Sequence, residues 1–104
     1  MIKWSNELYM DDSIKKKPDK WKKKVEDGKL THSLFCICLA SNEKNLFDIM
    51  NCNELLFRHY KKNALYITGL AKTREDAIDL LQDMLEDIYR ETGDIKVKDY
   101  FTFS

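Results

Sequence analysis

The residues best suited to chemistry in this sequence lie on two short segments, each of which follows a predicted strand. Ser41 and Asn42 follow the first strand, and Gly69, Lys72 and Thr73 follow the second. A lysine, a threonine hydroxyl and the free backbone amides of a helix start are suited to hold a phosphate or a carboxylate. The sequence therefore predicts a crevice between these two segments that binds an anion or a nucleotide-like ligand.

A competing interpretation of the second segment assigns no ligand to it. Thr73 then only caps the following helix, and Lys72 is solvated. The segment GLAKT has a Lys-Thr pair but lacks the two glycines and the GK[ST] order of a phosphate-binding P-loop. Three carboxylates that follow within two helical turns would also weaken anion binding: Glu75, Asp76 and Asp79.

The cysteines are the other candidates for chemistry. Cys36 and Cys38 point to one face of a predicted strand, about 7 Å apart along it, and His32 lies about 13 Å away on that face, too far to share a small metal. Cys52 and His59 would lie some 10 Å apart on a helix, too far for a nucleophile and its base. Buried free cysteines are common in protein cores, so we expect no metal and no cofactor.

A run of lysines surrounds an aromatic residue near the start of the chain. Trp21 lies among Lys15–Lys17 and Lys20–Lys24, a pattern that suits phosphate contacts and base stacking. Val25, four residues after Trp21, indicates instead that the indole packs against the protein. The domain as a whole is not basic, so the sequence argues against nucleic-acid binding.

The segment that best positions these residues is 64–94, which predicts a buried strand, a tight loop and a long helix. Leu65–Thr68 are apolar, aromatic or β-branched, as in a strand covered on both faces. Thr73 begins a capping box with Asp76, and Gly93 occupies the expected left-handed C-cap position. Between them, one apolar stripe recurs at helical spacing: Ala77, Ile78, Leu81, Met84, Leu85, Ile88 and Tyr89.

The rest of the chain predicts alternating helices and strands. Residues 1–14 show no clear period and are expected to form an N-terminal arm, and Lys15–Asp27 to form a helix. His32–Ala40 predicts a central strand, and the spacing of Leu46–Met50 predicts the start of a helix. Ile95–Phe103 alternates like an edge strand, with Lys96 and Lys98 protecting the edge.

This alternation predicts an α/β fold in a single domain over residues 15–104. We expect a small, three-stranded, mainly parallel sheet flanked by helices, with the N-terminal helix as one of them. Strand order 2-1-3 is favoured over 1-2-3, because the first strand is the most apolar and the last is amphipathic. In the order 2-1-3 the predicted crevice opens where the connections diverge at the carboxyl ends of strands one and two.

Composition narrows the class of protein. The 104 residues include 18 basic and 18 acidic side chains, so no global field attracts the chain to nucleic acid or to a membrane. No apolar run approaches the roughly 20 residues of a membrane span, and the N-terminus lacks a signal-peptide core. Three cysteines, an odd number, are expected to be reduced thiols in a cytoplasmic protein.

Charge is unevenly distributed along the chain. Residues 1–31 contain 9 lysines and 6 acidic residues, whereas residues 71–94 contain 3 basic and 8 acidic residues. Solvated helix faces account for most such runs. The acidic helix expected at residues 74–92 is also a possible docking face for a protein partner, so the asymmetry can be satisfied within the chain, between copies or by another protein.

Three segments together resemble a group of short, conserved bacterial α/β proteins of uncharacterised function. They are CLASN after the first predicted strand, GLAKTREDA after the second, and IYRETGD at the end of the long helix. The resemblance covers roughly residues 18–98 and implies no activity or ligand. From the residues themselves we expect a non-catalytic interaction or regulatory module that self-associates, because no catalytic arrangement is visible. The alternative is a small-molecule binding domain that uses the crevice described above.

Overall fold

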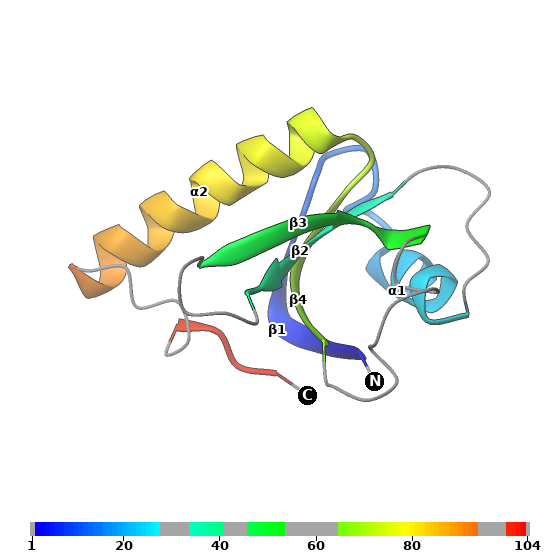
Figure 1. Cartoon of the computed structure of the whole chain (residues 1–104), viewed down its shortest axis with the longest axis horizontal. Helices are drawn as coiled ribbons and strands as arrows, with labels where there is room; N and C mark the ends of the chain where they lie inside the picture. Colours follow the sequence, from blue (N-terminus) through cyan, green and yellow to red (C-terminus); the bar gives the residue numbers. More distant parts are fainter. Residues whose placement is uncertain (1, 28–33, 41–45, 54–64, 94–99, 104) are drawn as a thin grey trace.

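The fold is a four-stranded mixed sheet with two helices (Figure 1). The computed structural model describes residues 2–27, 34–40, 46–53, 65–93 and 100–103. The elements in chain order are β1 (Ile2–Met10), α1 (Pro18–Asp27), β2 (Phe35–Leu39), β3 (Phe47–Asn51), β4 (Leu65–Ala71) and α2 (Arg74–Thr92). The strand order is β1-β4-β2-β3, in which β1 and β4 are parallel and the other two pairs are antiparallel.

The prediction of a three-stranded, mainly parallel sheet of order 2-1-3 with an N-terminal helix was therefore wrong. Its first error was at Leu46–Met50, where spacing suggested a helix. The segment instead forms β3, which pairs with β2 through five antiparallel residue pairs from Phe35↔Asn51 to Leu39↔Phe47. Phe47 and Ile49 fit a period of two as well as a helical period, and pairing with β2 decides between them.

The second error was at the N-terminus, where residues 1–14 were expected to be an arm. Ile2–Met10 is a strand, but its pairing with β4 shifts between Trp4 and Tyr9. The residues between them turn toward the C-terminal segment: Ser5 bridges Phe103, and the Asn6 N–H donates to the Thr102 carbonyl over 2.8 Å. This irregularity removes the alternation by which a strand is recognised in a sequence.

The predicted edge strand at Ile95–Phe103 falls mostly outside the described residues, since 94–99 are not among them. Its described part, Tyr100–Phe103, belongs to no strand of the sheet and forms only the antiparallel bridge to Ser5. Phe101 is buried, and its ring makes edge-on contacts with Tyr9 and Phe47. The segment thus closes one side of the core through aromatic contacts.

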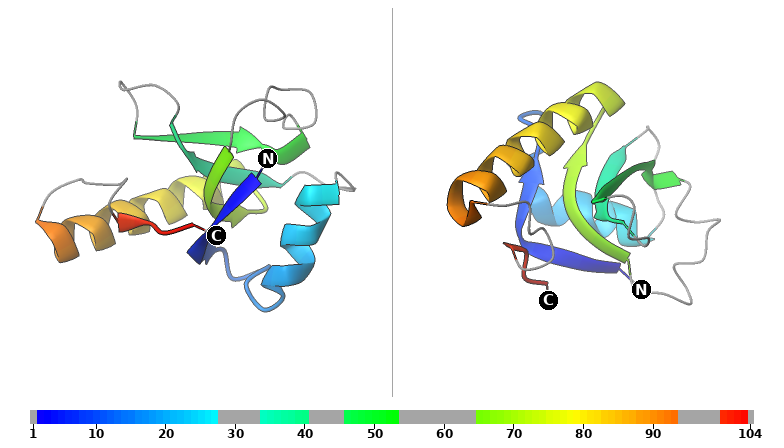
Figure 2. Two further views of the ribbon diagram at one scale, coloured as in Figure 1. Left: turned by 90° about the horizontal axis from the view of Figure 1, so that it is seen from below. Right: turned by 60° about the vertical axis from the view of Figure 1, so that its left-hand side comes forward.

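The two helices lie on different sides of the strands (Figure 2), and a separate hydrophobic cluster is buried on each face of the sheet. The α2 cluster contains Ile37, Ala71, Ala77, Met84, Ile88 and Phe101. The α1 cluster contains Trp4, Ile14, Val25, Leu34, Cys36, Cys38, Cys52, Ile67 and Leu70. The register of β2 and β4 shifts between Ile37 and Cys38, so no residue of β2 lies directly opposite Thr68 in the pairing. As a result, Ile67 and Leu70 both belong to the α1 cluster. The Thr68 hydroxyl donates to the Ile37 carbonyl over 3.1 Å.

Local sequence predicted α2 at its exact ends, whereas α1 begins at Pro18, three residues after the predicted start of the helix at Lys15, and follows β1. Thr73 is the N-cap: its Oγ1 accepts from the Asp76 N–H at 3.0 Å, as the capping pattern implied. Gly93 has φ of 72° and donates to the Tyr89 carbonyl. Pro18 begins α1, where its missing N–H costs no hydrogen bond. Neither described helix is long and apolar enough to cross a membrane.

Candidate functional site

The structure describes only part of the predicted anion crevice. Ser41 and Asn42 lie outside the described residues. Strands β2 and β4 are antiparallel, with Phe35 opposite Ala71 and Cys38 opposite Ile67. The carboxyl end of β2 therefore lies next to the amino end of β4, away from the carboxyl end of β4. The argument that brought the two segments together depended on parallel strands. The crevice formed by all five residues stays a prediction, now without that support.

Gly69 lies inside β4, opposite Ile37 on β2 and Tyr9 on β1. A Cβ atom at this position would lie 2.6 Å from the Met84 Cε atom and 3.2 Å from the Tyr9 carbonyl oxygen. Glycine therefore permits the close approach of α2 and of the Tyr9 backbone to β4. No positive φ is needed here, since Gly93 is the positive-φ glycine of the described chain.

The start of α2 already holds an anionic group from this chain. The Thr73 hydroxyl is engaged by the Asp76 N–H, and the Lys72 N–H donates to Asp11 Oδ2 over 2.7 Å. The other carboxylate oxygen of Asp11 accepts from the N–H and the hydroxyl of Ser13. The Asp11 carboxylate thus accepts the Lys72 N–H, one of the backbone donors that were expected to bind a free anion.

The side chain of Lys72 joins a second group of lysines instead. Its Nζ lies 5.8 Å from the centroid of the Trp21 ring, and the Nζ atoms of Lys20 and Lys24 lie 5.4 and 4.9 Å from it. Trp21 is half-buried, and none of the three lysines forms an ion pair with a described carboxylate. We call Lys20, Trp21, Lys24 and Lys72 the basic surface. The face of the indole ring stabilises the three ammonium groups by cation–π contacts. The same ammonium groups cover the ring face on which a nucleic-acid base would stack.

Carboxylates gather next to the basic surface. An open groove of about 560 Å³ lies between the turn after β1 and the first half of α2, and Tyr9, Met10, Ser13 and Leu80 contribute to its lining. We call the five carboxylates that line it the acidic groove: Asp11, Asp12, Asp76, Asp79 and Asp83. Lys15 forms a 2.8 Å ion pair with Asp12 and lowers the pKa of that carboxyl.

The basic surface and the acidic groove are adjacent. Asp11 lines the groove with its carboxylate, which also binds the backbone of Lys72, whose ammonium belongs to the basic surface. Sequence reasoning identified Lys72, the lysines around Trp21 and the acidic helix separately. It missed their proximity, because that depends on α1 and the β4–α2 turn meeting in the fold.

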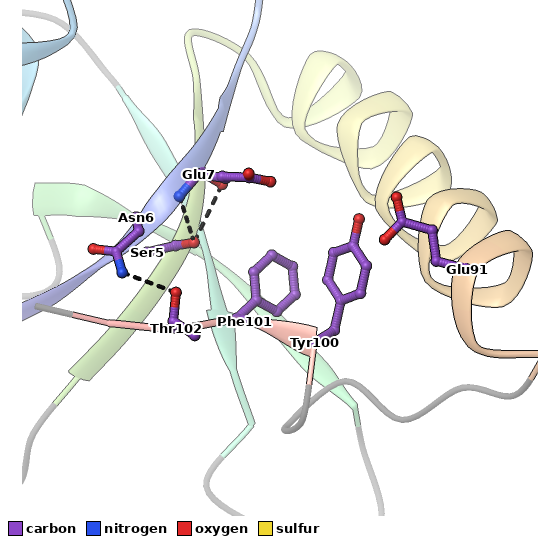
Figure 3. Close-up of a pocket in the computed structure, with 7 residues that line it drawn as sticks. All are labelled: Ser5, Asn6, Glu7, Glu91, Tyr100, Phe101 and Thr102. Atoms are coloured by element: carbon purple, nitrogen blue, oxygen red, sulfur yellow. Dashed lines mark hydrogen bonds between the residues drawn. The ribbon is translucent and has the colours of Figure 1, made fainter.

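A further pocket of about 360 Å³ lies between the irregular part of β1, the end of α2 and the C-terminal segment (Figure 3). Its polar groups bond to one another: Asn6 Nδ2 donates to Thr102 Oγ1 over 2.8 Å, and the Ser5 hydroxyl bonds to the backbone of Glu7. Nearby, Tyr9 donates to Asp87 over 2.6 Å, and its pKa is raised by burial and by this bond. These contacts hold β1, α2 and the C-terminal segment together and suit a structural role.

All three cysteines are free and buried. Cys36 and Cys38 share one face of β2, as predicted, with their sulfur atoms 3.5 Å apart. In the described ranges, no three His, Cys, Asp or Glu side chains are arranged to hold a metal ion. The two histidines, His32 and His59, lie outside those ranges, so the predicted separations from them remain predictions.

Comparisons with protein-family models, with curated proteins and with solved structures find no match to this chain.

Proposed function

We propose that the protein is a non-catalytic interaction module that self-associates by placing the basic surface of one copy on the acidic groove of another. The observation that carries the proposal is the adjacency of the two surfaces at Asp11 and Lys72. Each surface presents several like charges whose repulsion a partner of opposite charge relieves. The free thiols are consistent with a cytoplasmic location, which we include in the proposal.

Adjacency favours a closed, twofold dimer. When complementary patches are neighbours, a twofold axis that passes between them lets each copy present both patches to the other. Two equivalent contacts then form in one interface. Patches on opposite sides of the molecule would instead build open chains.

The expected dimer is weak and sensitive to salt. Exposed ion pairs contribute about 0 to 1 kcal/mol each, and twofold symmetry doubles their number. The Debye length is about 30 Å at 0.01 M salt and about 3 Å at 1 M, so high salt should dissociate the dimer. Sedimentation velocity across a series of protein concentrations at these two salt levels tests this expectation.

A charge swap gives the sharper test. Lys20→Glu with Lys24→Glu makes the basic surface acidic, and Asp79→Lys with Asp83→Lys makes that part of the acidic groove basic. Each double variant alone should be monomeric at low salt, whereas their equimolar mixture should dimerise, because both contacts of the mixed dimer regain opposite charges. Lys23→Glu and Glu86→Lys are matched controls on the same two helices, since both residues are exposed and lie outside both surfaces.

Two results would refute the proposal. One is a wild-type protein that stays monomeric at low salt throughout the concentration series. The other is a pair of double variants that fail to associate with each other while the wild type dimerises.

A second candidate function is binding of a small phosphate-bearing molecule at the basic surface. It is favoured by the convergence of three ammonium groups from two elements on one ring. Calorimetric titration with inorganic pyrophosphate should then give saturable binding to wild type and weaker binding to Lys72→Ala. Equal binding by both proteins would remove Lys72 from such a site.

A further inference from the structure

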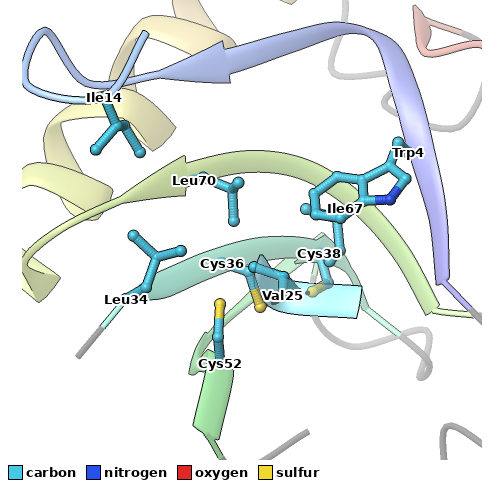
Figure 4. Close-up of a cluster of buried hydrophobic side chains, with 9 residues drawn as sticks. All are labelled: Trp4, Ile14, Val25, Leu34, Cys36, Cys38, Cys52, Ile67 and Leu70. Carbon is cyan, nitrogen blue, oxygen red and sulfur yellow. Dashed lines mark hydrogen bonds between the residues drawn. The ribbon is translucent and has the colours of Figure 1, made fainter. Parts of the chain in front are cut away.

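The three cysteines of the chain meet on one face of the sheet, beneath α1 (Figure 4). Cys36 and Cys38 alternate with Ile37 along β2, so both side chains leave the strand on the α1 side. Cys52 follows β3, and its N–H donates to the Leu34 carbonyl over 2.6 Å, which places it beside Cys36 on the same face. The exposed fraction of each cysteine is 2% or less.

We propose that Cys36 and Cys38 form a redox pair that a hydroperoxide converts into a disulfide within β2. Their sulfur atoms are 3.5 Å apart and must close to about 2.05 Å. Two residues along a strand span about 6.6 Å between Cα atoms, which lies at the upper end of the range for disulfides. The irregular pairing with β4 falls between Ile37 and Cys38, where a strand bends most readily.

Cys36 is the nucleophile of the pair. Thiol hydrogen bonds from Cys38 and Cys52 stabilise negative charge on its sulfur and lower its pKa, whereas the bond to Cys36 and burial raise the pKa of Cys38. The thiolate is the reactive form of cysteine. The bond to Cys36 and burial raise the pKa of Cys52 as well, so the choice of Cys38 as the linked partner rests on the 3.5 Å separation of its sulfur from that of Cys36.

The chemistry balances with the hydroperoxide as oxidant. The Cys36 thiolate attacks the terminal peroxide oxygen, the O–O bond breaks, and the leaving alkoxide takes the proton lost by Cys36, which gives an alcohol and a sulfenic acid. The Cys38 sulfur then attacks the sulfenic sulfur, the S–O bond breaks, and water leaves with the Cys38 proton. Two thiols and one hydroperoxide thus give one disulfide, one alcohol and one water.

Access to the buried pair requires α1 to move. Val25 is the buried residue of this 10-residue helix, and it belongs to the same buried cluster as Cys36 and Cys38 (Figure 4). A short helix held by one buried side chain, Val25, and one half-buried side chain, Trp21, opens at a lower free energy than the whole fold. At protein concentrations low enough to keep the chain monomeric, the rate of oxidation should therefore report the opening of α1.

The test is a peptide map of full-length wild-type protein treated with hydrogen peroxide, its remaining thiols then blocked with iodoacetamide. The expected product is one chain that has lost two hydrogen atoms, with Cys36 linked to Cys38 and only Cys52 alkylated. Cys52→Ala should still form this link, whereas Cys38→Ala should stop at a sulfenic acid that dimedone traps. A Cys36–Cys52 link, a link between two chains, or three unmodified thiols would each overturn the proposal. If Cys38→Ala fails to fold, the wild-type map decides alone.

A second pair of variants tests the role of α1. Val25→Ala should speed oxidation by about 5- to 30-fold, because loss of two methyl groups from the contact shifts local opening by that factor. Ile88→Val, a truncation under α2, is the control and should leave the oxidation rate nearly unchanged. Equal acceleration by both variants would show that oxidation follows unfolding of the whole protein, and would refute the opening of α1.

Discussion

The two faces of the sheet are covered by helices that differ in length and in how much they bury. On one face, α2 has 19 residues, caps at both ends and three buried side chains, Ala77, Met84 and Ile88. On the other, α1 has 10 residues and one buried side chain, Val25. The α1 face also contains the free thiols and a buried Trp4 Nε1 that has no hydrogen-bond partner among the described residues.

This difference indicates that the α2 face stabilises the fold, whereas the α1 face opens more easily. The α2 face is packed and bonded like a scaffold, with Tyr9 bonded to Asp87 and the Phe101 ring in contact with Tyr9 and Phe47. The α1 face carries most of the basic surface on its outside and the thiols beneath it. We infer that opening is concentrated on the α1 face, because few contacts hold it closed.

Met84→Ala should have the largest effect on stability. Met84 is fully buried between α2 and the sheet, and its sulfur contacts the Thr68 hydroxyl at 3.6 Å. Truncation should lower the free energy of unfolding by about 2 to 5 kcal/mol, measured by urea denaturation. Val25→Ala should cost only about 1.6 kcal/mol, by the loss of two methyl groups. A greater loss for Val25→Ala than for Met84→Ala would reverse the comparison between the faces.

Gly69→Val should come next. The new side chain would press on Met84 Cε and on the Tyr9 carbonyl oxygen, and only the methionine end can yield easily. We expect a loss of about 1 to 3 kcal/mol from overpacking, by the same denaturation measurement. If the variant is as stable as wild type, α2 is not seated as closely on the sheet as a scaffold requires.

Thr73→Ala removes the N-cap of α2. The Asp76 N–H loses its acceptor, and the loss should be about 0.5 to 2 kcal/mol, or only a few tenths for Thr73→Gly. Thermal unfolding of the two variants measures the difference. Should Thr73→Ala leave stability unchanged but weaken pyrophosphate binding, Thr73 would act in a ligand site and not as a cap.

Tyr9→Phe removes the bond to Asp87, so it should lower stability below about pH 10, and its difference from wild type should narrow at alkaline pH. Burial and the bond to Asp87 raise the Tyr9 pKa in the folded protein, so its contribution is complete below about pH 10 and is lost as pH rises above that value. Wild type should therefore lose more stability than Tyr9→Phe between pH 9 and pH 11, as urea midpoints would show. Parallel losses would mean that Tyr9 does not tie β1 to α2.

What could be predicted from the sequence was local. The α2 helix and its caps depend on neighbours within four residues, and the common face of Cys36 and Cys38 depends only on the alternation of a strand. Strands β1 and β3 were missed because the pairing of β1 with β4 is irregular, and because the spacing of Phe47–Met50 also suits a helix. Non-local pairing decides both cases.

The candidate site shows the same limit. Lys72 was singled out from the sequence for its charge, but its neighbours in the fold are Trp21 and Asp11, which are distant in sequence. No local pattern connects these residues. The adjacency of the basic surface and the acidic groove follows only from the way α1 and the β4–α2 turn meet.

Hydrogen–deuterium exchange of the wild-type protein at low salt, at low and high protein concentration, tests the difference between the faces most directly. Amides of α1 should exchange faster than those in the middle of α2 at low concentration, and should slow at high concentration as the basic surface becomes covered. Exchange of α1 that is as slow as that of α2 and independent of concentration would contradict the account.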